Sequence, residues 1–217
     1  MKKLNMIIMG PPGAGKGTQA KKIIAKYNIP HISTGDMFRE AMEEGTPLGL
    51  LAKKYINDGH LVPDDVTIGL VKERLSKDDC AKGYLLDGFP RTIPQAEALD
   101  KLAAEIGREI SVVISIDTPK EELIRRITGR LVCKNCGAPY HKETRKPKVP
   151  GICDICGGEL VQRPDDNKEA LEVRLAHYDK QTKPLLEYYE KKGLVHTLDG
   201  KKGADALMDD IEKILEA

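Results

Sequence analysis

A glycine-rich loop with a single lysine lies near the start of the sequence. The stretch "GPPGAGKGT", Gly10 to Thr18, follows a short apolar run and precedes a helical pattern. Glycines let successive backbone N–H groups turn toward a phosphate, while the helix N-terminus and the Lys16 ammonium add positive charge. The usual phosphate-loop pattern has Ser or Thr directly after the lysine, but Gly17 stands there and Thr18 comes one position later. The loop therefore predicts a nucleoside triphosphate site in which the position after the lysine offers Mg²⁺ no hydroxyl.

Four of the five cysteines form two C-x-x-C pairs. Cys133 pairs with Cys136 and Cys153 with Cys156, and a glycine follows each pair. Four thiolates are a closed ligand set for a structural zinc ion, and the glycines allow a left-handed turn around the metal. Iron with the same spacing is an open alternative. Because disulfides are rare in a reducing cytosol, we expect a metal rather than cross-links. Cys80 has no partner nearby and is expected to be a structural thiol.

Arginines recur beside loops and at expected segment junctions. Transfer between two phosphates requires groups that hold anionic oxygens and stabilise the charge on the moving phosphoryl group. The planar guanidinium binds such oxygens two at a time. The five candidates for a convergent cluster are Arg39, Arg91, Arg130, Arg163 and Arg174.

Short apolar runs alternate with longer stretches of helical periodicity. The predicted strands are Met6 to Met9, Pro30 to Ser33, Tyr84 to Leu86, Val112 to Ile116 and Leu194 to Leu198. Helical stripes begin at Ala20, Ile68, Leu171 and Leu207. Continuous apolar strands that alternate with helices are typical of a parallel sheet covered on both faces. The pattern therefore predicts an α/β fold.

Two segments interrupt this alternation. Residues 34–62, here called the insertion, are expected to be helical and are long for a crossover. Residues 129–166, here called the lid, contain the cysteine pairs and four prolines without a strong period. A loop of that length inside a compact domain needs something to hold it in shape. The core domain is then expected to comprise residues 1–33, 63–128 and 167–217.

The totals exclude some classes of protein. The 35 Lys and Arg residues nearly balance the 34 Asp and Glu residues, whereas nucleic-acid binders usually carry a basic excess. No window approaches the length of about 18 apolar residues that a membrane-spanning helix needs. The first apolar run is too short for a signal peptide and is expected to be a strand. We therefore expect a cytoplasmic protein without nucleic-acid or membrane partners.

Several stretches in combination resemble one enzyme family. "GPPGAGKGTQ", "HISTGDMFR", "DGFPRT" and "TGR" followed by the cysteine-bearing segment are similar to adenylate kinases, specifically the bacterial long form with a zinc-binding lid. A glycine at position 17 is normal for that family. The resemblance implies a three-layer P-loop nucleoside monophosphate kinase fold, with a five-stranded parallel sheet and two mobile insertions. It also implies a monomer that reversibly transfers the terminal phosphoryl group of MgATP to AMP, giving two ADP.

The same resemblance implies roles for individual residues. The AMP site would comprise Thr34, Arg39, Leu61, Val62, Gly88, Arg91, Gln95, Arg163 and Arg174, of which Thr34 and Gln95 would read the adenine. The ATP site would comprise Gly13, Ala14, Gly15, Lys16, Gly17, Thr18 and Arg130, with Tyr140 and Lys202 near the adenine and ribose. Asp36 and Asp87 would hold water molecules of the Mg²⁺ shell. The catalytic groups would be Lys16, Arg91, Arg130, Arg163 and Arg174.

The acceptor needs no general base in this interpretation. A phosphate monoester has its second pKa near ~6, so at neutral pH it is mostly a dianion that can attack directly. We therefore predict that none of the five histidines is catalytic: His31, His60, His141, His177 and His196. Closure of the insertion and the lid would exclude water, which could otherwise accept the phosphoryl group.

Two other functions fit parts of the pattern. A zinc-ribbon nucleic-acid-binding NTPase could use the basic stretch "HKETRKPK" between the cysteine pairs as its contact surface. The absence of interleaved aromatic residues argues against this alternative. A nucleotide-bound switch with little transfer activity would need only the phosphate loop. AMP-dependent formation of ADP distinguishes the three.

Overall fold

A computed structural model describes residues 3–216. Its centre is a five-stranded, wholly parallel sheet with strand order β2-β3-β1-β4-β8. The strands are β1 (Leu4–Met9), β2 (His31–Ser33), β3 (Gly83–Asp87), β4 (Val112–Asp117) and β8 (Val195–Asp199). Each overlaps a strand predicted from the sequence, so the α/β class and the parallel five-stranded sheet are confirmed.

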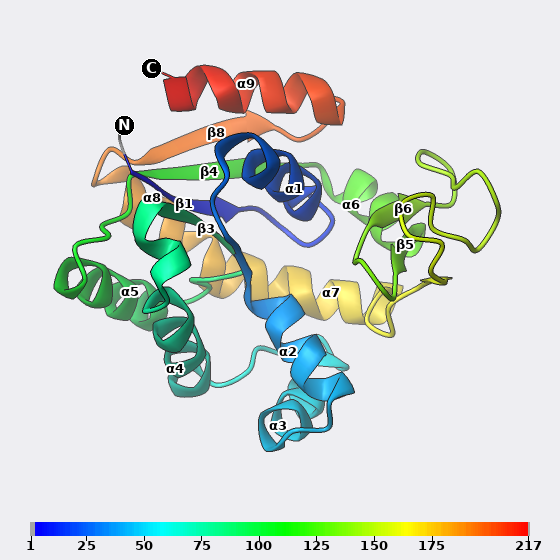
Figure 1. Cartoon of the computed structure of the whole chain (residues 1–217), viewed down its shortest axis with the longest axis horizontal. Coiled ribbons are helices and arrows are strands. Elements are labelled where there is room, and N and C mark those ends of the chain that lie inside the picture. Colours follow the sequence, from blue (N-terminus) through cyan, green and yellow to red (C-terminus); the bar gives the residue numbers. More distant parts are fainter. Residues whose placement is uncertain (1–2, 217) are drawn as a thin grey trace.

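Side chains of β1 alternate between two hydrophobic cores. Ile7 and Met9 belong to one buried cluster, and Met6 and Ile8 belong to the other. Helices α4 (Asp64–Leu75), α5 (Ile93–Glu105) and α8 (Pro184–Glu190) contribute to the first cluster. Helices α1 (Lys16–Tyr27), α6 (Lys120–Thr128) and α9 (Ala204–Glu216) contribute to the second. Because successive residues of a strand point to opposite faces, this alternation gives three layers, helix on sheet on helix (Figure 1).

The insertion forms a small helical unit at the end of β2. Helices α2 (Thr34–Glu43) and α3 (Pro47–Ile56) pack together around Phe38, Ala52 and Val62, a cluster separate from the two main cores. Figure 1 shows the pair projecting away from the sheet. Both helices are capped by side-chain oxygens. At the start of α2 the Ser33 hydroxyl accepts from the Asp36 N–H, and at the start of α3 the Thr46 hydroxyl accepts from the Gly49 N–H.

The lid contains a second sheet of three antiparallel strands. These are β5 (Arg130–Cys133), β6 (Pro139–His141) and β7 (Leu160–Val161), in the order β6-β5-β7. The lid has its own small buried cluster of Cys133, Ala138, Tyr140, Cys153 and Leu160. It lies at the end of α7 (Lys168–His177), on the opposite side of the molecule from α5 (Figure 1). A further turn, Asp78–Lys82, precedes β3, and a π-helical turn, Tyr178–Thr182, links α7 to α8.

The domain boundaries predicted from the sequence stay predictions. The described residues nevertheless place α2 and α3 inside 34–62 and all three lid strands inside 129–166. No helix among the described residues is both long and apolar enough to cross a bilayer.

Candidate functional site

The glycine loop connects β1 to α1 at the carboxyl edge of the sheet. Gly13 and Gly15 have φ values of 88° and 99°, a region that residues with a β-carbon rarely adopt. Lys16 is the first residue of α1, and its Nζ donates to the carbonyl oxygens of Gly10 at 2.8 Å and Pro11 at 3.0 Å. The loop therefore curls around its own lysine beside a helix N-terminus, as the phosphate-binding prediction requires.

Lys16 lies among other cations. The pKa of its ammonium is lowered to about 8, chiefly by burial; the charge of Asp87 raises it, and the nearby guanidiniums of Arg91, Arg174 and Arg130 also lower it. The three guanidiniums and the ammonium itself give this position a positive potential, which favours an anion. Several phosphate oxygens at this position would be attracted by all four cations together.

A pocket opens between the insertion and the core. Its lining includes nearly all the side chains predicted for AMP: Thr34, Arg39, Leu61, Val62, Gly88, Arg91, Gln95 and Arg174. Arg163 is not part of this lining. A second pocket adjoins the first, and of the residues predicted for ATP its lining includes Lys16, together with Gly10 and Pro12 of the same loop. Arg91 and Arg174 line both pockets and so lie where the two spaces meet.

Hydrogen bonds fix the walls of the first pocket. The Thr34 hydroxyl donates to the Gly88 carbonyl oxygen at 3.0 Å, and Nε of Arg91 donates to the same oxygen at 2.8 Å. Thr182 also donates to the Arg91 carbonyl oxygen at 2.9 Å. Gln95 is 2% exposed, and its Oε1 accepts from the Arg91 N–H at 2.8 Å. These bonds hold the Arg91 backbone while its side chain faces both pockets.

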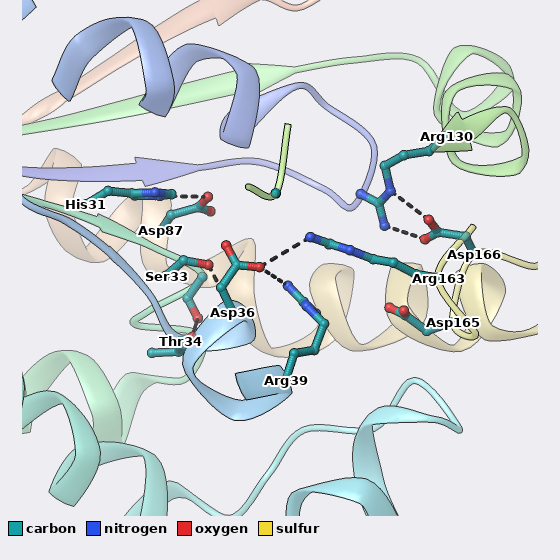
Figure 2. Close-up of polar contacts among 12 residues, drawn as sticks. His31, Ser33, Thr34, Asp36, Arg39, Asp87, Arg130, Arg163, Asp165 and Asp166 are labelled. Carbon is teal, nitrogen blue, oxygen red and sulfur yellow. Dashed lines mark hydrogen bonds and ion pairs between the residues drawn. The ribbon is translucent and has the colours of Figure 1, made fainter. Parts of the chain in front are cut away.

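Asp36 lies between two of the predicted phosphate-binding arginines. Arg39 donates to its Oδ1 at 2.6 Å and Arg163 donates to the same oxygen at 3.2 Å (Figure 2). Burial alone would raise the pKa of Asp36, but the two guanidiniums outweigh it and hold the pKa at about 2. The contact joins the lid to the insertion through a charged pair.

Two buried aspartates at the end of the lid, Asp165 and Asp166, bind Arg174 and Arg130. The sequence analysis did not identify either aspartate. Nε of Arg130 donates to Asp166 at 2.7 Å in a two-point pairing, and Arg174 donates to Asp165 at 2.8 Å. Figure 2 shows both carboxylates on the segment that follows Arg163. The stretch "RPDDN" carried a signal that could have been used, since paired acids directly after a phosphate-binding arginine suggest partners for other arginines.

Asp87 faces the position where Gly17 departs from the usual loop. A β-carbon at Gly17 would lie 4.0 Å from Oδ2 of Asp87, so the carboxylate lies beside the position of the absent side chain. Burial raises the pKa of Asp87, but a hydrogen bond from His31 and the charge of Lys16 outweigh it, so that the pKa is lowered. His31 Nε2 is 3.3 Å from this carboxylate, a partner that the sequence did not indicate. An ionised carboxylate here suits Mg²⁺, which usually keeps several water molecules.

The other histidines lie in separate places. His141 is buried in the lid, where Nδ1 accepts from the Glu143 and Thr144 N–H groups, so Nε2 carries the proton and donates to the Arg125 carbonyl oxygen at 3.1 Å. His60 and His177 contact each other, Nδ1 to Nε2, at 3.0 Å. His196 is exposed on the edge strand β8.

The four lid cysteines converge. Their sulfur atoms all lie within 4.8 Å of one another, with Cys133 and Cys156 at 3.4 Å and Cys136 and Cys153 at 3.6 Å. Zinc–sulfur bonds of about 2.3 Å in a tetrahedron imply sulfur separations of about 3.8 Å, so the set fits a tetrahedral metal. A hydrogen bond from the Cys136 backbone N–H lowers the pKa of Cys133 and so favours the thiolate. Gly137 and Gly157 have φ values of 61° and 71°, as the left-handed turns after each pair require.

Tyr140, predicted near the adenine and ribose of ATP, lies inside the lid cluster. Its ring is 5% exposed inside the lid cluster, its hydroxyl accepts from the Asp154 N–H at 2.7 Å, and Cys153 Sγ is 3.6 Å away. The side chain packs against the cysteine cluster, and its role near the adenine or ribose stays a prediction. Lys202, predicted for the same nucleotide, follows β8 on the surface and pairs with Asp210.

Comparisons with known proteins cover nearly the whole chain. The family model described as "Adenylate kinase" matches residues 8–194. Similar proteins named adenylate kinase include one from Geobacillus sp. (strain WCH70), 58% identical over 98% of each chain. One from Carboxydothermus hydrogenoformans is 57% identical, covering 98% of this chain and 100% of its own. Another, from Methanosarcina barkeri, is 55% identical over 98% of this chain and 99% of its own.

Proposed function

Because the chain belongs to the adenylate kinase family, we propose that it transfers the terminal phosphoryl group of MgATP to AMP by direct in-line attack, giving two ADP. The observation that supports this most strongly is that Arg91 and Arg174 line both adjoining pockets. The first pocket is lined by eight of the nine residues predicted for AMP, and the second is lined by Lys16 of the phosphate loop together with Leu61, Gly88 and the same two arginines. Two guanidiniums at the junction can stabilise the charge that moves from one nucleotide to the other.

Each group in the site has a role in this proposal. The loop amides and Lys16 bind the ATP phosphates, while Arg39 and Arg91 bind the AMP phosphate. Arg130, Arg163 and Arg174 neutralise charge on the moving phosphoryl group. Asp36 and Asp87 would hold water molecules of Mg²⁺, which when bound neutralises phosphate charge.

No side chain acts as a general base. The AMP phosphate is mostly a dianion at neutral pH and attacks without losing a proton. Among the histidines, only His31 contacts a predicted Mg²⁺ residue, and it binds Asp87. The role of the lid and the insertion is to exclude water and bring the arginines together.

We assign the cysteine cluster to a structural zinc ion, because four thiolates leave no open position for a substrate. The proposal also includes a monomer in the cytoplasm with ATP, AMP and ADP as its partners. The zinc-ribbon nucleic-acid-binding alternative is not favoured, since the kinase family match extends through the residues that carry the cysteine pairs.

The experiment is a coupled assay of ADP formation from MgATP with AMP, CMP, UMP or GMP as the acceptor, with ATP hydrolysis measured in parallel. Rapid ADP formation that depends on AMP is the expected result. Hydrolysis that AMP does not accelerate would contradict the proposal. A tight, salt-dependent complex with RNA would instead favour the nucleic-acid-binding alternative.

A further inference from the structure

The carboxamide of Gln95 can have only one orientation. Its one end faces a pure donor, the Arg91 backbone N–H at 2.8 Å, and its other end faces a pure acceptor, the Asp64 carboxylate at 2.7 Å. Oxygen must therefore point to Arg91 and nitrogen to Asp64. In the reversed orientation Oε1 would face the carboxylate and Nε2 would face the N–H, so both contacts would be repulsive.

Asp64, which binds the Gln95 amide, belongs to α4, whereas Gln95 belongs to α5. Asp64 is the first residue of α4, and its other oxygen accepts from the Thr92 hydroxyl at 2.9 Å. Thr92 caps α5 by accepting from the Gln95 N–H at 3.3 Å. A glutamine three residues after a threonine cap commonly bonds back to the N–H of the cap. Here the Gln95 amide bonds to Arg91 and Asp64 instead. These bonds fix its orientation in the pocket wall and do not cap the helix.

The fixed amide has bonding capacity left for a ligand. One N–H and one oxygen lone pair of Gln95 are unused by the protein, and the side chain lines the pocket beside Thr34 and Val62. Adenine presents an amino donor next to a ring-nitrogen acceptor, which a glutamine amide can match at both points. Hypoxanthine has the same ring shape but has a carbonyl acceptor in place of the amino donor. A fixed amide therefore distinguishes the two bases, and an amide free to rotate does so less well.

We propose that Asp64 is a positioning residue for base preference, which acts by locking the Gln95 carboxamide in the orientation that matches adenine. This proposal rests on the proposed function, in which Gln95 reads the base. Asp64 is not among the residues that line the pocket. Asp64 also accepts from the Thr92 hydroxyl, and the ratio of activities with two different bases separates its effect on Gln95 from a general effect on the start of α5.

The test compares AMP with IMP as the acceptor. The quantity measured is the ratio of kcat/KM for AMP to kcat/KM for IMP, in the wild-type protein and in Asp64→Ala, Asp64→Asn, Gln95→Ala and Asp65→Ala. Asp65 is the matched control, because it is the next acidic residue in the first turn of α4 and is exposed. Asp64→Asn keeps one acceptor oxygen for Gln95 Nε2 and is the conservative variant.

We expect Asp64→Ala to lower the ratio about tenfold, mainly through a higher KM for AMP and a lower KM for IMP. Asp64→Asn should restore the ratio to within about threefold of wild type, and Asp65→Ala should leave it unchanged. A purely structural role for Asp64 would lower the melting temperature and reduce activity with both acceptors equally. That outcome, with the ratio unchanged in Asp64→Ala and lowered in Gln95→Ala, overturns the proposal.

The Gln95→Ala variant separates this inference from the proposed function. An unchanged ratio in Gln95→Ala would show that the base is read elsewhere, which would contradict the site assignment. Should Asp64→Ala fold poorly, the Asp64→Asn and Asp65→Ala pair still gives a decision. Asp64→Asn removes the negative charge but keeps an acceptor oxygen, so a ratio about two- to threefold below that of Asp65→Ala supports the proposal, and a ratio equal to that of Asp65→Ala contradicts it.

Discussion

Arg163 of the lid and Asp36 of the insertion form an ion pair, with Nη2 and Oδ1 3.2 Å apart. The two residues are 127 positions apart in sequence and belong to the two segments predicted to close over the substrates. Asp36 also binds Arg39 at 2.6 Å. One carboxylate therefore brings together two guanidiniums from opposite sides of the site, close to the position where phosphate oxygens are proposed to bind.

Replacement of Arg163 by alanine should lower kcat/KM for ADP formation by about 10² or more, because removal of one donor to a transition-state charge commonly has an effect of that size. Lysine at this position should recover only part of the activity, since it cannot bind two oxygens in a plane. The coupled ADP assay measures both effects.

Arg125→Ala is the matched control for Arg163. Arg125 is an exposed arginine on α6 whose side chain pairs with Glu122, outside both pockets. Its replacement should change kcat/KM by less than twofold. Equal losses in the two variants, with matching losses of melting temperature, would mean that Arg163 acts through stability.

ATP affinity should fall as the pH rises above 8. In the free protein the Lys16 ammonium has a pKa of about 8, lowered first by burial. Bound phosphates raise this pKa, so ATP binds the protonated form more tightly. Above the free pKa, and up to the bound pKa, each further pH unit should therefore weaken binding by up to tenfold. Below pH 8 this effect should be absent, because Lys16 is already protonated.

Binding of ATP measured calorimetrically from pH 7 to 9.5, in buffers of different ionisation enthalpy, checks this expectation. Proton uptake on binding should appear above pH 8 and grow with pH. Lys16→Met is the control, and its weaker binding should show no such uptake from this position. A wild-type affinity that stays constant to pH 9.5 would contradict the prediction.

The parts of the molecule with strong local patterns could be predicted from the sequence. Met6 to Met9 forms a strand because a short apolar run followed by glycines has few alternatives in an α/β chain, and the loop with Lys16 continues it directly. The cysteine pairs are equally local, since each C-x-x-C followed by glycine specifies its own turn.

The partners of the arginines could not be predicted in the same way. Asp166 is buried against Arg130, 36 positions away, yet in the sequence it is one more acid in a polar stretch. Asp64 likewise looks like a charge that favours a helix N-terminus. The resemblance predicts Tyr140 near a nucleotide, and its packing beside Cys153 is a further contact that the sequence did not indicate. Long-range pairing depends on the fold, and one sequence gives no direct signal of it.

Alanine or asparagine in place of any single histidine should leave phosphoryl transfer largely intact. His31→Asn should show the largest effect, at most about tenfold, because Nε2 of His31 contacts Asp87 and helps to hold that carboxylate ionised. His60, His141, His177 and His196 should each change turnover about twofold or less at 25 °C. The measurement is kcat at saturating MgATP and AMP. A thousandfold loss with the fold intact would show that a general base is required after all.

Removal of the metal that we propose for the lid cysteines should loosen the lid and leave the chemistry possible. Metal binding contributes folding free energy, so chelation or Cys153→Ser should lower the melting temperature, by about 2–4 °C for each kcal/mol lost. Amide hydrogen exchange should accelerate in β5 (Arg130–Cys133) and remain slow in β1 (Leu4–Met9), because the two strands belong to separate sheets. Transfer should persist at temperatures where the core stays folded, at a lower rate because Arg130 and Arg163 are held less firmly.

The control for the metal experiment is Cys80→Ala. Cys80 is buried in a main core, away from the lid cluster, so this variant should keep the full metal content per chain even if it is less stable. Cys153→Ser should lose most of the metal, measured by release to a chromogenic chelator. Complete loss of transfer in metal-free protein whose β5 amides still exchange slowly would point to a metal that takes part in the reaction. Residual transfer with fast exchange in β5 would support a structural metal, because four thiolate ligands leave no position at which a phosphate could bind.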